Sequence, residues 1–134
     1  MATTDTFQCS VITPERAVLE CDSTFVAFPA HDGEMGVLTK RAPLLCKLGI
    51  GQLRVESPTE KHLLFIDGGF VQVVGNRVTI LTEQALPAAD IDPEVASQAL
   101  VEARAMKGTD VESVDARNRA IQRAKVQIKL SRAT

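Results

Sequence analysis

The sequence is poor in aromatic side chains: it contains no tryptophan, no tyrosine and only five phenylalanines in 134 residues. Because apolar residues still make up 45% of the chain, we expect an aliphatic core. No apolar run approaches the roughly 20 residues that a membrane-spanning helix needs. The first residues have neither the basic nor the apolar segment of a secretory signal peptide. These absences predict a soluble, intracellular globular protein.

Cysteine and histidine are equally scarce. The three cysteines are widely spaced and odd in number, at Cys9, Cys21 and Cys46. This pattern excludes a disulfide framework and a CxxC metal site. The histidines, His31 and His62, stand about thirty residues apart without clustered carboxylates, which predicts no metal site. A nucleophilic site would have to combine Cys46 with His31 or His62 and Asp32, and no spacing in the chain favours that arrangement.

The first two thirds of the chain consist of short β-type runs separated by turn residues at intervals of about ten. The expected strands are 7–12, 17–20, 23–28, 35–38, 44–48, 52–56, 63–67, 70–74 and 77–81. So many short strands predict a β-sandwich or flattened barrel. We interpret Gly49–Gly51 as a turn, and Gly68 and Gly69 as a break that supplies unusual backbone angles or room for a neighbouring chain. Neither glycine pattern predicts a nucleotide-binding loop.

The periodicity changes to a helical one after Leu86. Asp92 is a candidate N-cap and Pro93 suits the first helical position, while Gly108 is expected to end this helix in a left-handed conformation. A second helix is predicted from about Ser113 towards Leu130. The fold class is therefore β followed by α: a β-sandwich domain at 1–88 and an antiparallel two-helix hairpin at 90–134.

The hairpin is expected to be only conditionally stable, because alanines dominate its first helix and bury little apolar area. Its second helix is strongly basic: residues 117–134 contain six basic residues and no acidic one. Three interpretations are open. The charges form a solvated helix face, they engage an acidic protein surface, or they bind nucleic acid, although no aromatic side chains accompany them.

Three ordered motifs resemble one family. Gly33–Leu38, followed by Arg41–Leu45 and 49–54, is similar to the Glu-Gly-Glu-(Leu/Met)-Gly and Gly-x-(Leu/Ile)-Arg signatures of the epsilon subunits of F-type ATP synthases. The Gly-Gly-Phe and Val-Thr-(Val/Ile)-Leu signatures of that family match 68–73 and 76–81. The third motif, Asp90–Pro93 before an alanine-rich helix, matches the junction to the family's helical hairpin.

The resemblance implies a non-catalytic rotor subunit of the central stalk. The implied partners are the gamma subunit, the membrane c-ring and the alpha/beta catalytic head, with no nucleic acid. The implied role is to couple c-ring rotation to the head and to restrain ATP hydrolysis through the hairpin. It also implies a peripheral position on the cytoplasmic face of the inner membrane, or on the thylakoid membrane.

The family's contacts carry over residue by residue. Glu34 and Arg41 fall in the c-ring loop, where Arg41 replaces the usual histidine. Val71 and Val73 fall in the region used against gamma, and a core role is equally compatible with their identity. The implied contacts with the head are basic residues of the second helix: Arg117, Arg119, Arg123, Lys125 and Lys129.

Some members of the family bind ATP through an Ile/Leu-Asp-x-x-Arg-Ala motif. The matching residues here are Ile91, Asp92, Val95 and Ala96, so Val95 replaces the arginine. Because the phosphate-pairing cation is missing and Glu94 adds a negative charge, the sequence predicts no ATP site and no cofactor.

Overall fold

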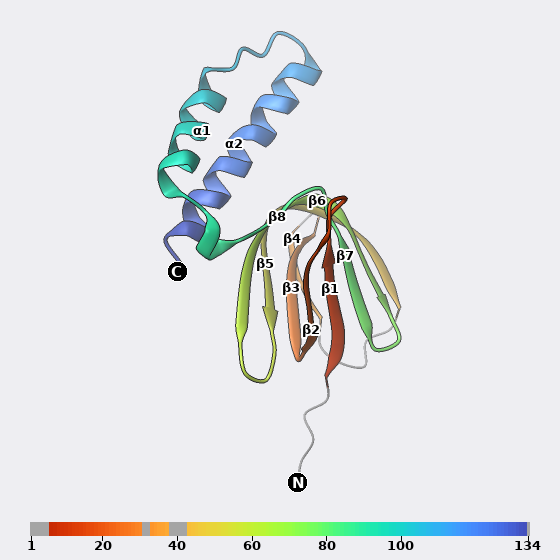
Figure 1. The fold of residues 1–134 in the computed structure, drawn as a ribbon. Helices are drawn as coiled ribbons and strands as arrows, with labels where there is room; N and C mark the ends of the chain where they lie inside the picture. The colour runs from red at the N-terminus through yellow and green to blue at the C-terminus, as the bar shows by residue number, and fades with distance from the viewer. Residues whose placement is uncertain (1–5, 31–32, 38–42, 134) are drawn as a thin grey trace.

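The computed structural model describes residues 6–30, 33–37 and 43–133. These residues form eight strands, a short 3-10 helix and two α-helices (Figure 1). The strands are β1 (Phe7–Ile12), β2 (Ala17–Ser23), β3 (Phe25–Ala30), β4 (Gly33–Val37), β5 (Leu44–Glu56), β6 (Lys61–Val74), β7 (Arg77–Leu81) and β8 (Ala85–Pro87). They are followed by η1 (Ala88–Asp90), α1 (Pro93–Ala105) and α2 (Val111–Ser131). This architecture confirms the predicted β-then-αα fold class.

The strands form one mixed sheet in the order β2-β1-β7-β6-β5-β3-β4, and β8 pairs with β6 off this path. The β1–β7 pair is parallel, whereas the remaining pairs are antiparallel. The sheet curls around an aliphatic core to which β1, β3, β5, β6 and β7 all contribute. Figure 1 shows the two helices standing at one end of this β domain.

Two predicted breaks in the chain turn out to lie inside long strands. Gly49–Gly51 is not a turn, because β5 runs through it without interruption. A β-carbon on Gly51 would lie 2.8 Å from the β-carbon of Pro29, so this glycine lets β3 approach β5 closely. Gly68 and Gly69 do adopt the unusual angles that we expected, with φ of +68° and +106°, but they bend β6 without ending it.

The helical hairpin begins as predicted and turns differently. Asp92 is the N-cap of α1, and its carboxylate accepts a hydrogen bond of 2.9 Å from the backbone N–H of Glu94. Gly108 does not end α1 in a left-handed conformation, because the helix already ends at Ala105 and Met106 caps it with extended backbone angles. The second helix starts at Val111, two residues before the expected Ser113, since Asp110 and Ser113 form a capping box.

The hairpin packs on the β domain mainly through α2. A second apolar cluster joins Leu130 to Phe65 of β6, together with Ile91 and Ala96 near the start of α1. It is separate from the core of the β domain and much smaller. The docked arrangement therefore rests on limited apolar burial, as the alanine-rich helix suggested.

Candidate interaction surfaces

Of the residues considered for catalysis, the structure describes Cys46 and His62, and each contacts a group outside that set. Cys46 of β5 is half-buried, and its thiol donates to the carbonyl oxygen of Lys47 at 3.4 Å. Nε2 of His62 lies 3.3 Å from a carboxylate oxygen of Glu60. Burial raises the pKa of the Cys9 thiol to about 12, which keeps it protonated. His31 and Asp32 lie outside the described residues. Within the described part of the chain, no three His, Cys, Asp or Glu side chains are grouped so as to hold a metal.

An exposed apolar patch covers the outer side of β5, β6 and β7. Four large apolar side chains form it, and we call it the apolar face: Leu45, Phe70, Val74 and Leu81. Leu45 is 71% exposed and Phe70 is 51% exposed. Phe70 pairs with Leu81 on one side and with Lys47 on the other. Leu45 pairs with Gln72 and Val74 pairs with Arg77, so the four apolar side chains are interspersed with polar ones. An outer face that exposes four large apolar side chains is a candidate protein-interaction site.

The two valines expected at a partner contact point the other way. Val71 and Val73 are 0% and 3% exposed and belong to the core. Because side chains alternate along a strand, their neighbours Phe70, Gln72 and Val74 face outward instead. Val71 and Val73 therefore have the core role that their identity also allowed, and the exposed side chains of this stretch are those of Phe70, Gln72 and Val74.

Of the two residues expected at the c-ring, the structure describes one, Glu34. Glu34 is part of β4, where its backbone pairs with Pro29 of β3. Arg41 lies outside the described residues.

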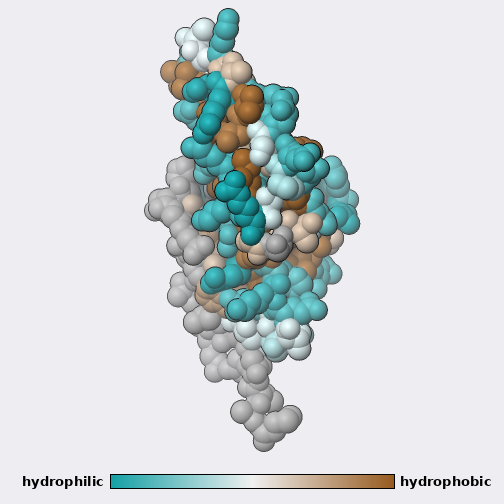
Figure 2. All heavy atoms as spheres, turned by 90° about the vertical axis from the view of Figure 1, so that its left-hand side faces the viewer, coloured by the Kyte–Doolittle hydropathy of each residue, from teal (hydrophilic) through white to brown (hydrophobic). Residues whose placement is uncertain are grey.

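The basic residues of α2 do not form one surface. Figure 2 shows polar and apolar side chains interspersed over the hairpin. Arg119 lies 3.4 Å from Asp115 of the same helix, while Nε of Arg123 donates to Oδ2 of Asp67 in β6 at 2.7 Å. The side chains of Lys125 and Lys129 are exposed, and that of Arg117 is half-buried.

The contact with Asp67 is one that sequence reasoning missed. Beside it, Nε2 of Gln122 donates to the carbonyl oxygen of Ile50 at 3.1 Å. Nothing in the local pattern distinguishes Asp67 from any polar residue at the end of an apolar run. Its pairing across 56 positions follows only from the packing of α2 against β6.

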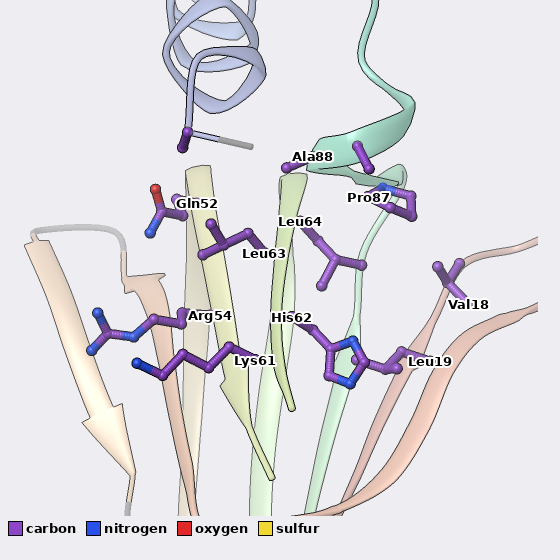
Figure 3. A pocket seen from close by; sticks show the side chains of 12 residues that line it. Val18, Leu19, Gln52, Arg54, Lys61, His62, Leu63, Leu64, Pro87 and Ala88 are labelled. Carbon is purple, nitrogen blue, oxygen red and sulfur yellow. The ribbon is translucent and has the colours of Figure 1, made fainter. Parts of the chain in front are cut away.

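A cavity of about 600 Å³ opens on the flank of the β domain (Figure 3). Val18 and Leu19 of β2 form one wall, and Lys61 to Leu64 of β6 form the opposite one, below η1. Two of its three basic side chains already have acidic neighbours. His62 lies beside Glu60, and Nε of Arg54 is 3.1 Å from Glu56 without making a hydrogen bond. Arg54 also lies 5.2 Å from the ring centre of Phe25, so its charge is engaged within the fold.

The residues that match the ATP motif have structural roles here. Ile91 and Ala96 are buried in the cluster beneath α2, and Asp92 caps α1. Val95 is 64% exposed and provides no cation at the position where the motif has arginine. The arrangement lacks a phosphate-pairing side chain at this point.

No helix among the described residues is long and apolar enough to cross a membrane.

Comparison with known proteins identifies the chain's relatives. Residues 6–88 match the family model described as the ATP synthase delta/epsilon chain, beta-sandwich domain. An ATP synthase epsilon chain of Rhodopirellula baltica is 39% identical over 125 residues, which cover 93% of this chain and 98% of that relative. The epsilon chain of Carboxydothermus hydrogenoformans is 43% identical over 102 residues, 75% of each chain.

A solved structure extends the likeness to both parts of the fold. A chain of the Euglena gracilis mitochondrial ATP synthase, in a structure of its OSCP, F1 and c-ring, superposes with a TM-score of 0.82 at 26% identity. The match covers 96% of this chain and 82% of that one, so it includes the helices.

Proposed function

This chain belongs to the family of ATP synthase delta/epsilon chains, and we propose that it couples c-ring rotation to the catalytic head of an F-type ATP synthase and restrains ATP hydrolysis through its hairpin. The proposal rests on the division of the molecule into a β domain and a helical hairpin. A β domain with an exposed apolar face supports a hairpin that is held by a small cluster and carries exposed cations.

The apolar face is our candidate contact with the gamma subunit. It is rigid, because its residues alternate with core residues on the same strands. Lys47 and Arg77 border it, so a partner with apolar side chains and an acidic margin would complement it. The proposed contact with gamma no longer includes Val71 and Val73, and consists instead of the four residues of the apolar face: Leu45, Phe70, Val74 and Leu81.

The c-ring contact is proposed at Glu34 and Arg41, from the resemblance of their segment to the family's loop. With the β domain seated on the ring and gamma on the apolar face, torque would pass through the sheet. The chain itself would not catalyse a reaction, and the coupling ion is a proton or sodium. It would be a peripheral subunit on the side of the membrane that carries the catalytic head.

The restraint on hydrolysis is proposed to come from the basic residues of α2, which would meet acidic surface on the catalytic head when the hairpin leaves the β domain. They are Arg117, Arg119, Arg123, Lys125 and Lys129. We do not propose nucleic-acid binding, because two of these cations are already paired with carboxylates and α2 contains no aromatic side chain on which bases could stack.

Charge reversal tests the inhibitory role. ATP hydrolysis by a catalytic head depleted of its own epsilon subunit is measured with the full chain and with a Lys125→Glu, Lys129→Glu variant. These two side chains are exposed and make no ion pair within the described residues, so their reversal should leave the fold intact. We expect the variant to inhibit at least severalfold less. Equal inhibition by both proteins would exclude these lysines as head contacts.

A further inference from the structure

Among the described residues, Arg123 is the basic residue of α2 that pairs with a carboxylate outside its own helix. Arg123 reaches from α2 to Asp67 of β6, with the side chains 37% and 18% exposed. The bond is short, at 2.7 Å, and joins two elements that lie 56 positions apart in the sequence. A charge-assisted hydrogen bond between partly buried groups is stronger than a fully exposed surface ion pair.

The other ion pair of α2 provides the contrast. Arg119 pairs with Asp115 one turn earlier on the same helix, so this pair moves with the helix and is unaffected by docking. The Arg123–Asp67 pair forms only when α2 lies on the β domain. Gln122 adds a second contact with the same property, to the carbonyl oxygen of Ile50.

We propose that Arg123 has two mutually exclusive acidic partners: Asp67 while the hairpin is docked, and the acidic surface of the catalytic head once the hairpin is released. Asp67 therefore acts as an internal substitute for the head. This inference rests on the proposed function, because it assigns a regulatory role to a cation of the same helix.

The rest of the docking surface is small enough for one ion pair to matter. Leu130 is the only fully buried large side chain that α2 contributes among the described residues, with Val126 and Ile128 packed around it. A contact that contributes on the order of 1 kcal/mol changes the ratio of docked to released hairpin about fivefold. Substitution of Asp67 and substitution of Arg123 should therefore differ in their effect on inhibition of the head.

Neutralising either partner should release the hairpin equally, yet the two variants should inhibit the head to different extents. Asp67→Asn frees an intact Arg123, so inhibition should strengthen about threefold to fivefold. Arg123→Met also frees the hairpin but removes the head contact, so inhibition should be weaker than with Asp67→Asn. A merely structural ion pair would not produce this difference in inhibition between the two variants.

Docking is measured first, on the full chain alone, by amide hydrogen exchange in α2. We expect exchange in the segment 122–131 to quicken about threefold to fivefold in Asp67→Asn and in Arg123→Met. The double variant should be no faster than either single one, because the interaction is already lost. Asp22→Asn, which neutralises an exposed carboxylate on β2, is the matched control and should exchange like the unaltered chain. Unchanged exchange in both single variants, or additive effects in the double variant, would overturn the inference.

Inhibition is measured next, by titrating an epsilon-depleted catalytic head with the same proteins. A lower half-inhibitory concentration for Asp67→Asn than for Arg123→Met supports the shared role of Arg123. Equal values for the two variants would overturn it. If hydrogen exchange shows that the Arg123–Asp67 pair stabilises docking, but neither the variants nor the unaltered chain inhibits the head, the proposed function fails while the docking contact stands. Gln122→Ala, which loosens docking without touching a charge, should strengthen inhibition in the same direction as Asp67→Asn.

Discussion

The α-carbon of Gly69 faces the carbonyl oxygen of Leu81 so closely that a β-carbon at position 69 would overlap it. Gly69 also has a φ of +106°, a conformation that L-residues rarely adopt. β6 runs through Gly69 from Asp67, beneath the hairpin, to Phe70 on the apolar face. The apolar face and the contact with the hairpin thus share one strand, on either side of Gly69.

Gly69→Ala should destabilise the protein by about 3 kcal/mol or more, because the backbone of β7 would have to move. Gly68 is the matched control: its φ is +68°, but no atom lies within 4 Å of a β-carbon placed there. Gly68→Ala should cost about 1 kcal/mol. Urea unfolding of both variants gives the comparison, and equal losses would contradict the role of the close approach.

This site shows where sequence reasoning succeeds and where it stops. The two glycines predicted unusual angles, and the angles are present, yet the sequence could not show that β6 continues through them. Alternation along β6 has the same limit: the pattern Phe-Val-Gln-Val-Val fits either face as the buried one. Only the packing of the sheet buries Val71 and Val73 and exposes Phe70. The N-cap at Asp92 was predictable because capping depends on neighbouring residues, whereas the Arg123–Asp67 contact depends on the tertiary fold.

The apolar face yields a binding prediction. Phe70→Asp should weaken association with the gamma subunit by at least tenfold, because it places a charge in the centre of an apolar contact. The fold should be preserved, since the side chain is half exposed. Val95→Asp, at an exposed apolar position on α1, should leave gamma binding unchanged. Affinity is measured by titration calorimetry with gamma from the same organism. Equal affinities for the two variants would exclude the apolar face as the contact.

The start of α2 should respond to acid. Hydrogen bonds from the Ser113 side chain and backbone hold the pKa of Asp110 below its ordinary value of 3.8. The cap therefore stabilises α2 fully above pH 3.8, and this contribution disappears as the pH falls through the lower, folded-state pKa. Circular dichroism should show helix loss in this range that is smaller in Asp110→Ala. Asp115→Ala is the control for removing a carboxylate from the same helix, and identical acid curves for all three proteins would refute the prediction.

ATP should not bind the isolated chain. Val95 leaves the motif without its cation, and Asp92 is committed to capping α1. Titration calorimetry with ATP and magnesium should show no saturable heat up to the millimolar range. Submillimolar binding would show that other side chains hold the phosphates.

We propose that the β domain binds the complex and that the hairpin restrains hydrolysis, a division of roles between two parts of the fold. Its most direct test is ATP hydrolysis by an epsilon-depleted catalytic head from the same organism, titrated with the full chain and with residues 1–89. We expect both proteins to bind the head and only the full chain to suppress hydrolysis. Suppression by residues 1–89 to the same extent, or failure of the full chain to bind, would contradict it.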